Sequence, residues 1–380
     1  MSQEIRDIVL SSLSAIGANH EAKFYAELFA SQEAERFALV VIDPRCLRNP
    51  LLESLIGSLR ILHNLGLTPV LLVGALDDDR TSVRFQSQRL ASEMEQSNIG
   101  VAKLNVATYG LIADIRKNTR SGRLVVLEMT NRSESMNLAG LARELQPNKI
   151  LFLQPSGGLT QDKTRIEDLT MDELPAVLGS GILSKGQTRF LKSVIALDGS
   201  TEKRRAYIIA SPLNLLTELF TTKGSGTLIR RKAVIKSGTS FKSLKKTVLK
   251  SSIEESFGKK INPSFFKNDL HRGFVETDYR GGALFTQLAA MVYLSKFWVV
   301  KPAQGEGIAR DIWDVMCEDI PAFFWRSRVG NPFNAWYMSA CDGMQSQGEW
   351  RVFWKGLDAA QIPAAIKAAG SAPDDFKTSK

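Results

Sequence analysis

Residues 293–309 join a β-rich run to a glycine-containing turn that could hold a phosphate group. The run YLSKFWVV (293–300) leads into the turn Gln304–Ala309, after which a helical pattern begins. Gly305 and Gly307 would let backbone N–H groups approach an anion closely, and the dipole of the following helix favours negative charge there. The pattern Q-x-x-G-x-A is weak by itself, because glycine-containing turns between a strand and a helix are common for structural reasons alone.

A second set of residues could bind carboxylates. In the strand predicted for FFWRSR (323–328), Arg326 and Arg328 point to the same face because side chains alternate along a strand. Two adjacent guanidinium groups are costly unless they meet anions, and their forked donors match carboxylates. Lys296, on the preceding strand, could add a third cation. The alternative is a pair of arginines on a solvated face.

Tyr337, at the end of NPFNAWY, could donate or relay a proton, although most buried tyrosines only pack and hydrogen-bond their hydroxyl group. The chain has three cysteines and three histidines, all widely spaced. This spacing excludes a disulfide framework and a four-cysteine zinc site, so we expect no metal. Nor does it offer a Cys/His or Ser/His arrangement for covalent catalysis.

Short β-rich runs alternate with helical stretches over residues 37–238, which predicts an α/β domain with a mostly parallel sheet. The runs are FALVVI (37–42), TPVLLV (68–73), RLVVLE (123–128), KILFL (149–153) and AYIIA (206–210). Apolar residues at helical spacing over residues 1–16 predict an amphipathic helix, so residues 1–36 are expected to form an N-terminal helical arm.

A basic connector is predicted to begin at residues 236–240, and a second domain over residues 245–372. This domain contains the runs 293–300 and 323–328 and the aromatic run WRVFW (350–354). The residues after Gly370 are polar, and we expect this tail to be frayed.

The composition is that of a globular protein. Hydrophobic residues make up 44% and charged residues 23%, which excludes a disordered or collagen-like chain. No apolar run approaches the roughly 18 to 20 residues that span a bilayer, so no membrane is expected. The N-terminus has neither a signal peptide nor an extension rich in Arg and Ser, which favours a bacterial cytoplasm.

The formal net charge of +9 is concentrated in one stretch. Between Lys223 and Lys260 there are eleven Lys or Arg and two Glu, which account for all of it. Such a stripe can attract nucleic acid or a phosphorylated cofactor. It has few aromatic residues for base stacking and matches no nucleic-acid-binding motif, so nucleic acid is the less favoured partner.

The same residues resemble a known family. From about Ser252 to Leu357 the chain is similar to the N-acetyltransferase domain of vertebrate-like N-acetylglutamate synthases and bifunctional bacterial synthase/kinases. The motifs that carry this resemblance are YLSKFWVV, AQGEGIARDIW, FFWRSRVGNPFNAWY, CDG and WRVFWKGL. The first domain resembles the amino-acid-kinase domain of the same proteins, through GLTPVLLVGA, LARELQPNKILFL and LLTELFTTKGSGTLIRR.

The resemblance implies a GNAT fold for the second domain and a set of site residues. Acetyl-CoA would be the co-substrate, with Tyr337 near the thioester sulfur. Four residues match family positions that bind the carboxylates of glutamate: Lys296, Arg326, Arg328 and Asn331. The positions that would hold coenzyme A are Phe297, Val299, Gln304, Gly305, Glu306, Gly307, Ile308 and Ala309. Cys341 stands where the family usually has a serine before Asp-Gly.

The first domain departs further from functional kinases of the family. The stretch that should carry a lysine and two glycines reads Val41-Ile42-Asp43-Pro44, and Phe190 stands roughly where a lysine belongs. An acid would repel phosphate and a proline removes a backbone donor, so we expect no kinase activity. In relatives this domain carries an arginine-feedback site and oligomer contacts. Glu218, Gly224 and Gly226 match the effector segment, although a helix ended by a glycine-rich turn needs no ligand.

The expected function is that of an acetyl-CoA:L-glutamate N-acetyltransferase that feeds arginine synthesis, by direct transfer to the α-amine in a homo-oligomer. Two alternatives stay open. The chain could acetylate a different amine by the same mechanism, or it could be a non-catalytic subunit that binds arginine and regulates a true synthase.

Overall fold

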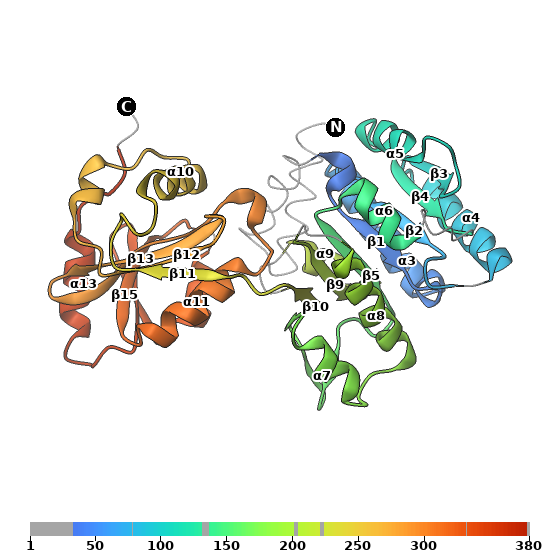
Figure 1. Cartoon of the computed structure of the whole chain (residues 1–380). Helices are drawn as coiled ribbons and strands as arrows, with labels where there is room; N and C mark the ends of the chain where they lie inside the picture. Colours follow the sequence, from blue (N-terminus) through green and yellow to red (C-terminus); the bar gives the residue numbers. More distant parts are fainter. Residues whose placement is uncertain are drawn as a thin grey trace. The chain divides into compact units, whose positions relative to one another are not determined.

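The structure is a computed structural model and describes residues 33–77, 79–130, 137–200, 204–220, 224–331 and 333–377. The chain divides into two compact units, Met1–Arg231 and Lys232–Lys380 (Figure 1). The amphipathic helix predicted over residues 1–16 lies outside the described residues. Of the predicted N-terminal arm, only its end is described, as the short 3₁₀ helix η1 (Ala34–Arg36).

The first unit is built on an eight-stranded sheet with the strand order β3-β4-β2-β1-β5-β9-β10-β8. All neighbouring strands are parallel except β9 and β10. The strands are β1 (Leu39–Ile42), β2 (Val70–Val73), β3 (Val101–Asn105), β4 (Leu124–Glu128), β5 (Lys149–Leu153), β8 (Asp168–Thr170), β9 (Ala206–Ala210) and β10 (Thr227–Arg230). A separate hairpin joins β6 (Thr160–Gln161) to β7 (Thr164–Arg165). The central strands are buried on both faces, as their continuous apolar runs require.

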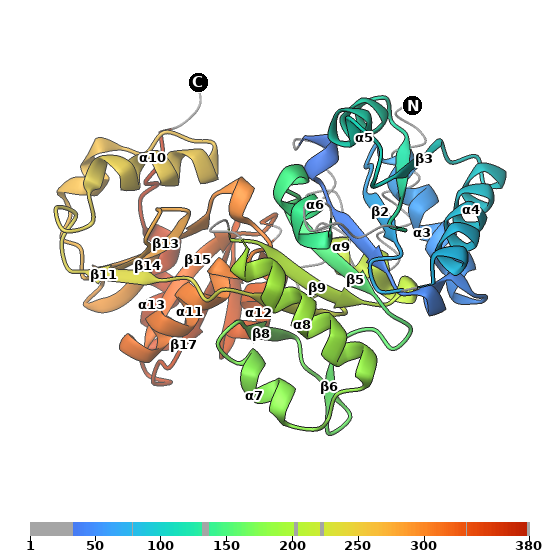
Figure 2. The ribbon, with the colours of Figure 1, turned by 45° about the vertical axis from the view of Figure 1, so that its right-hand side comes forward.

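Helices cover both faces of this sheet, as Figures 1 and 2 show. Residues of α3 (Leu51–Asn64), α4 (Arg80–Gln96) and α9 (Leu215–Phe220) join the core on one face. The core on the other face takes residues from α5 (Leu111–Arg120), α6 (Leu138–Leu145), α7 (Leu174–Gly179) and α8 (Lys185–Gly199). The 3₁₀ helices η2 (Pro44–Leu47) and η3 (Pro212–Asn214) follow β1 and β9. This is the mostly parallel α/β domain that the sequence predicts.

The second unit has a seven-stranded sheet with the order β11-β12-β13-β14-β15-β17-β16. Every neighbouring pair is antiparallel except β14 and β15, which are parallel. The strands are β11 (Ile235–Gly238), β12 (Arg272–Glu276), β13 (Gly281–Leu288), β14 (Met291–Val299), β15 (Phe323–Arg328), β16 (Gly343–Gln347) and β17 (Trp350–Lys355).

Two sets of elements cover the two faces of this second sheet. On one face, α11 (Ile308–Asp319) and α12 (Asn334–Ala340) pack on a core rich in aromatic rings. On the other face lie α10 (Lys246–Phe257), η4 (Pro263–Lys267) and α13 (Ile362–Ser371). Figures 1 and 2 show α10 and α11 on opposite sides of the sheet. The turn η5 (Lys301–Ala303) connects β14 to α11.

The boundary between the units falls earlier than the predicted residue 238. Residues 235–238 are not the beginning of a connector but strand β11, which pairs with β12 of the second sheet. The basic stretch continues into α10, whose Leu249 and Ile253 are fully buried. Basic residues therefore occupy the exposed side of folded elements here, while the apolar residues between them pack against the sheet.

The predicted frayed tail is also wrong. Helix α13 continues to Ser371, and residues 372–377 lie against the face of the sheet that carries Lys296. Phe376 packs its ring against Phe257, with ring centroids 4.9 Å apart, and forms a bridge with Ile261. A polar composition suggests fraying only when its charged groups have no partner, and these have several. Residues 372–377 are called the C-terminal segment below.

Candidate active site

The ladder between the parallel strands β14 and β15 is interrupted. Its register contains a single pair, Tyr293 with Phe324. Beyond this pair, residues of β14 bond to β13 and those of β15 bond to β17. The carboxyl halves of the two strands are therefore not bonded to each other, and the sheet has an interruption with different side chains on its two faces.

On the α11 side of the sheet, Tyr337 lies in a cage of aromatic rings. Its ring centroid is 5.6 Å from that of Trp325, 5.5 Å from that of Phe353 and 6.4 Å from that of Phe297. These partners come from β15, β17 and β14, so α12 delivers Tyr337 to the interruption itself. The side chain is buried, with 7% of its surface exposed.

The Tyr337 hydroxyl group makes no hydrogen bond to another residue within the described ranges, and the side chain contacts its neighbours through its ring. Burial raises the pKa of this phenol above its usual range. Tyr337 is therefore neutral at physiological pH and has a proton to donate. A protonated hydroxyl group with no partner among the described residues is available to hydrogen-bond a bound molecule.

On the opposite face of the same strands lies Lys296. The register shifts between Leu284 and Phe285, where Ser295 is the extra residue of a bulge in β14. The side chain of Lys296 is 4% exposed, and its ammonium group forms an ion pair with Asp375. Burial lowers the pKa of Lys296, and the attraction of Asp375 opposes that shift.

Arg326 and Arg328 share the face of Lys296, as the alternation predicts. Both guanidinium groups lie over the ring of Trp350, at 4.0 Å and 4.5 Å from its centroid. Arg328 forms ion pairs with Glu349 and with Asp374, the latter at 3.2 Å. Arg326 donates to three backbone carbonyls, those of Ala369, Ala372 and Pro373, at 2.7, 2.7 and 2.9 Å.

Asn331 does not join these three cations. Its Nδ2 donates to Ser327 Oγ at 2.7 Å, and Ser327 points to the face opposite to that of Arg326 and Arg328. Its Oδ1 accepts from the amide of Phe333 at 3.0 Å. The structure thus brings Lys296, Arg326 and Arg328 together and leaves Asn331 on the side of Tyr337, in a turn before α12.

The predicted phosphate turn has the backbone that such a turn requires. Gly305 and Gly307 both have positive φ angles, 82° and 81°, which favour glycine, and Gly307 is the N-cap of α11. The first amides of the helix have no intrahelical acceptor. Gln304 donates to Val299 O at 3.0 Å, while its Oε1 is buried and has no hydrogen-bond partner among the described residues. A donor from a bound molecule would satisfy this oxygen.

The carboxylate of Glu306 pairs with an arginine and does not contribute to binding of a phosphate. Its Oε2 accepts from Nη1 of Arg280 at 2.7 Å, and Nη2 of Arg280 donates to the fully buried Glu276 at 3.0 Å. Arg280 therefore links the turn between β12 and β13 to the glycine turn. The fit of the turn to a pyrophosphate rests on the backbone of residues 304–309, not on this side chain.

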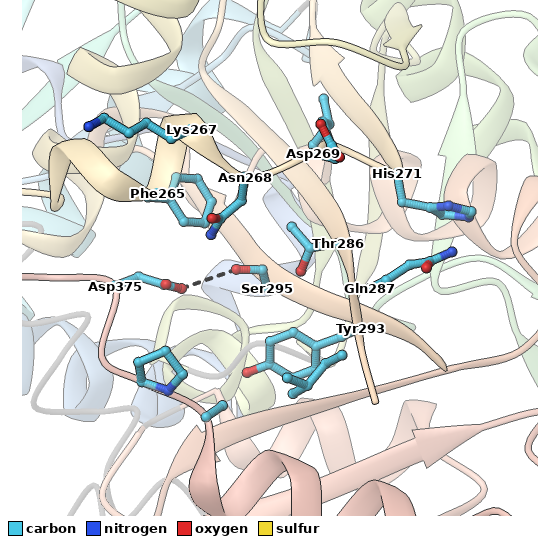
Figure 3. A pocket seen from close by; sticks show the side chains of 14 residues that line it. Phe265, Lys267, Asn268, Asp269, His271, Thr286, Gln287, Tyr293, Ser295 and Asp375 are labelled. Carbon is cyan, nitrogen blue, oxygen red and sulfur yellow. Dashed lines mark hydrogen bonds between the residues drawn. The ribbon is translucent and has the colours of Figure 1, made fainter. Parts of the chain in front are cut away.

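A pocket of about 750 Å³ lies beside the Lys296 face (Figure 3). Tyr293, Ser295 and Asp375 line it together with residues of the loop before β12. Burial raises the pKa of Tyr293, and the nearby Arg326 opposes that shift. Tyr293, Trp350 and Asp375 are the residues at this site that the sequence did not single out.

Cys341, in the loop after α12, has its sulfur 3.7 Å from the carbonyl oxygen of Met338. Burial raises the pKa of this thiol, so it is protonated. No group of three His, Cys, Asp or Glu residues lies close enough to hold a metal ion within the described ranges.

In the first unit, an ion pair lies directly after β1, at the stretch where the sequence departs from functional kinases. Asp43 accepts from the backbone amide of Arg45 at 2.9 Å and from two nitrogens of its side chain, at 2.9 and 2.8 Å. Pro44 begins the 3₁₀ helix η2 directly after Asp43. Phe190 is buried in the core, with its ring edge against Phe152.

The predicted effector residues do lie together. Glu218 Oε2 accepts from the amides of Ser225 and Gly226, both at 2.6 Å. Gly224 has a positive φ of 62°, and an added Cβ there would lie 2.8 Å from Glu218 Oε2. The carbonyl of Gly224 accepts from Arg165 at 3.3 Å. Glu218 therefore stabilises a tight turn whose carbonyl already holds a guanidinium group.

Comparisons with known proteins agree with this architecture. Residues 236–371 match the family model of the N-acetyltransferase of N-acetylglutamate synthase. Acetylglutamate kinase of Xanthomonas campestris is 31% identical over 407 aligned residues, which cover 89% of this chain and 94% of that protein. The mitochondrial N-acetylglutamate synthase of Mus musculus is 33% identical over 249 residues, 63% of this chain and 47% of that protein.

Two crystal structures of N-acetylglutamate synthase from Neisseria gonorrhoeae share the fold. One is complexed with coenzyme A and N-acetyl-glutamate, and the other with coenzyme A and L-arginine. Their TM-scores are 0.53 and 0.52 at 18% and 16% identity, over 90% of this chain and 98% of each solved chain.

None of the helices within the described ranges is both long and apolar enough to cross a membrane. The order of the two domains, the match of the second to the acetyltransferase model and the near full-length relative together define the family. The chain belongs to the family of vertebrate-like N-acetylglutamate synthases and bacterial N-acetylglutamate synthase/kinases, in which an amino-acid-kinase-like domain precedes a GNAT N-acetyltransferase domain.

Proposed function

We propose that this protein transfers the acetyl group of acetyl-CoA to the α-amine of L-glutamate and so supplies arginine synthesis. One observation carries the proposal. Lys296, Arg326 and Arg328 lie on one face of the interruption between β14 and β15 and suit a dicarboxylate. The neutral, buried phenol of Tyr337 lies on the opposite face of the same interruption. Acceptor and thioester can then approach the interruption from the two faces.

The residues 297–309 are suited to hold coenzyme A. Backbone groups of β14 around Phe297 are not bonded to β15, which leaves them for the amides of the pantetheine arm. The carbonyl of Val299 already accepts from Gln304 and Ser256, so coenzyme A would have to replace one of these donors to use it. The glycine turn and the N-terminus of α11 offer backbone N–H groups and a favourable dipole to the pyrophosphate. The unpaired Oε1 of Gln304 supplies an acceptor at the same place.

The reaction needs a deprotonated α-amine, a C–N bond formed at the acetyl carbonyl and a C–S bond broken. Tyr337 would donate its proton to the departing thiolate. Because its hydroxyl group makes no hydrogen bond to another described residue, no existing bond must break first. General acid catalysis of this kind contributes typically about 10²- to 10⁴-fold. Solvent would take one proton from the α-ammonium group before the attack. The second proton, which the nitrogen loses as the amide forms, would return to Tyr337 through water, so that one proton in all is released.

Glutamate would be recognised by Lys296, Arg326 and Arg328. The forked donors of arginine match carboxylates, and the ring of Trp350 holds both guanidinium planes in place. The α-amine reacts in its uncharged form, so a residue that contacts it does not need a charge. Asn331, on the Tyr337 side, would contact the acetyl group or the amine and not the carboxylates.

The first unit would lack kinase activity. Asp43 places a carboxylate at the end of β1, and its pairing with Arg45 removes the guanidinium group from phosphate binding. Phe190 has no charge to offer and is buried in the core. The experiment is incubation with ATP and N-acetylglutamate. We expect no ADP above the rate without acceptor, and acceptor-dependent ADP would refute this part of the proposal.

Regulation by arginine, a homo-oligomeric state and a cytoplasmic location are parts of the same proposal. Glu218, Gly224 and Gly226 would form an arginine site only if the effector replaces Arg165 at the Gly224 carbonyl. Thermal unfolding with and without arginine measures such binding, since a ligand that binds only the folded state raises the unfolding temperature. An unchanged temperature at saturating arginine would refute the effector site.

The decisive experiment for the acetyltransferase is thiol release by the purified protein with acetyl-CoA and each amino acid in turn. Release that depends on glutamate supports the proposal. Release with another amine would identify a different acceptor. No release with any amine would leave the regulatory subunit as the function.

A further inference from the structure

The C-terminal segment occupies the cations that the proposed function assigns to the substrate. The ammonium group of Lys296 pairs with Asp375, and a guanidinium nitrogen of Arg328 lies 3.2 Å from Asp374. Arg326 donates to the carbonyls of Ala372 and Pro373. Two consecutive carboxylates of the chain therefore meet the cations that two carboxylates of glutamate would need.

We infer that residues 372–377 form a pseudosubstrate strap, in which Asp374 and Asp375 imitate the two carboxylates of glutamate and must leave before glutamate binds. This inference rests on the proposed function and adds to it a mode of regulation. The match is specific to a dicarboxylate, because Asp375 pairs with the ammonium group of Lys296 and Asp374 pairs with the guanidinium group of Arg328.

The buried charge of Lys296 gives a physical reason for such a strap, because a carboxylate of glutamate can replace that of Asp375. Lys296 is almost fully buried, so its ammonium group is stable only with a counter-ion close by. A site that waited for its substrate with no anion would leave this charge uncompensated. With the strap in place Asp375 neutralises it, and glutamate can take over this role without a buried charge left unpaired.

The arginines are held by contacts that survive release of the strap. Trp350 stacks with both guanidinium groups, and Glu349 pairs with Arg328. Trp350 and Glu349 belong to β17 and its turn, not to the strap. The recognition site is therefore preformed, and only its occupant changes.

The strap is anchored at its far end by backbone hydrogen bonds and by Phe376, whose ring also lies 5.2 Å from the ammonium group of Lys296. The amide of Asn262 donates to Asp375 O at 2.8 Å, and the amide of Lys377 donates to Lys260 O at 2.8 Å. The ring of Phe376 packs against Phe257 at 4.9 Å. These few contacts hold a segment of six residues that contains no helix or strand, which leaves it removable.

The strap also borders the open pocket. Asp375 lines that pocket with Tyr293 and Ser295, and Figure 3 shows its carboxylate hydrogen-bonded to the Ser295 hydroxyl group, at 3.1 Å. Asp374 is more than half exposed. An acceptor that enters from this side meets the strap carboxylates at the solvent edge, where displacement can begin.

The test compares glutamate kinetics of the full-length protein with those of Asp374→Asn/Asp375→Asn, which keeps the shape of the strap and removes its charge. If the strap closes nine in ten molecules, its release lowers the apparent KM for glutamate by up to about tenfold. We expect a fall of several-fold, with the KM for acetyl-CoA unchanged. Asp358→Asn, which removes a surface carboxylate of the same domain away from these cations, is the matched control.

A second variant covers the case in which loss of the Asp375 charge unfolds the domain. Phe376→Ala weakens the anchor and leaves all charges in place, so it should also lower the KM for glutamate. If both variants fold and the KM for glutamate is unchanged or higher, the two acids are structural counter-ions and the inference is overturned.

Binding of glutarate separates this inference from the proposed function. Glutarate carries two carboxylates and no amine, so calorimetric titration tests the strap without any turnover. Tighter binding of glutarate to Phe376→Ala than to the wild type supports the strap even if no thiol is ever released with glutamate. Equal or weaker binding overturns the strap while leaving the acetyltransferase assay to stand by itself.

Discussion

Replacement of Tyr337 by phenylalanine separates the chemical role of its hydroxyl group from its packing. The ring contacts to Trp325, Phe353 and Phe297 involve carbon atoms that phenylalanine retains. Only the hydroxyl group is lost, and it makes no hydrogen bond to another residue in the part of the chain that the structure describes. The substitution therefore removes a proton donor from the interruption between β14 and β15 and leaves the aromatic cage intact.

Two magnitudes follow from this geometry. Loss of a general acid lowers kcat by about 10²- to 10⁴-fold, which corresponds to roughly 3 to 5 kcal/mol of activation free energy at 1.36 kcal/mol per tenfold. Loss of a buried hydroxyl group without a partner leaves the free energy of unfolding within about 1 kcal/mol of the wild type, because no internal hydrogen bond is broken. Activity should fall steeply while stability stays the same.

The assay is thiol release at saturating glutamate and acetyl-CoA, combined with denaturant unfolding of the same preparations. Both KM values should stay near those of the wild type, since the hydroxyl group acts when the thiolate departs. Tyr279→Phe, a tyrosine outside the aromatic cage, is the control and should keep kcat. A kcat for Tyr337→Phe within about twofold of the wild type, or a loss of activity that parallels a loss of stability, would refute the role of general acid.

Three further predictions concern other parts of the second domain. Arg328→Ala should raise the KM for glutamate about tenfold and leave that for acetyl-CoA unchanged, because a half-exposed charge contributes near the lower limit of about 1.5 kcal/mol for a charged hydrogen bond; equal changes in both KM values would contradict the assignment. Gly307→Ala should raise the KM for acetyl-CoA, since its φ of 81° is unfavourable for alanine, whereas Gly66→Ala, with a φ of 76° in the first domain, should not; kinetics that are the same for both variants would count against the turn. Burial would raise the pKa of Glu276, but the hydrogen bond and charge of Arg280 outweigh this effect and lower the pKa from its usual value of 4.5. The pair therefore stabilises the domain at pH values above 4.5, and this stabilisation is lost as the pH falls further. Acid unfolding of Glu276→Gln should accordingly show a lower stability near pH 7 and a shallower loss below pH 4.5, and identical profiles would disprove the linkage.

Much of the fold follows from local sequence. The runs KILFL, AYIIA and FFWRSR coincide with β5, β9 and β15, because each is a short apolar run bounded by residues that end strands. The strand β3 (Val101–Asn105) was missed. It lies at the edge of the sheet and carries polar residues, so it lacks the continuous apolar run of the central strands.

The candidate site was less predictable. Alternation along β15 correctly places Arg326 and Arg328 on one face, because that rule depends on neighbours in sequence. The partners of these cations do not obey such a rule. Asp375 reaches Lys296 across 79 positions, and nothing in the local sequence of either residue indicates the other. The one available signal was Phe376, an aromatic residue in an otherwise polar tail, which indicates a buried contact.

The most direct test of the account is a structure of the protein in complex with coenzyme A and N-acetylglutamate. We expect the thiol of coenzyme A at the interruption between β14 and β15 on the Tyr337 face, within hydrogen-bonding distance of the phenol. We expect the two carboxylates of N-acetylglutamate on Lys296, Arg326 and Arg328, with Asp374 and Asp375 displaced. Carboxylates bound away from these cations, or a thiol remote from Tyr337, would contradict it.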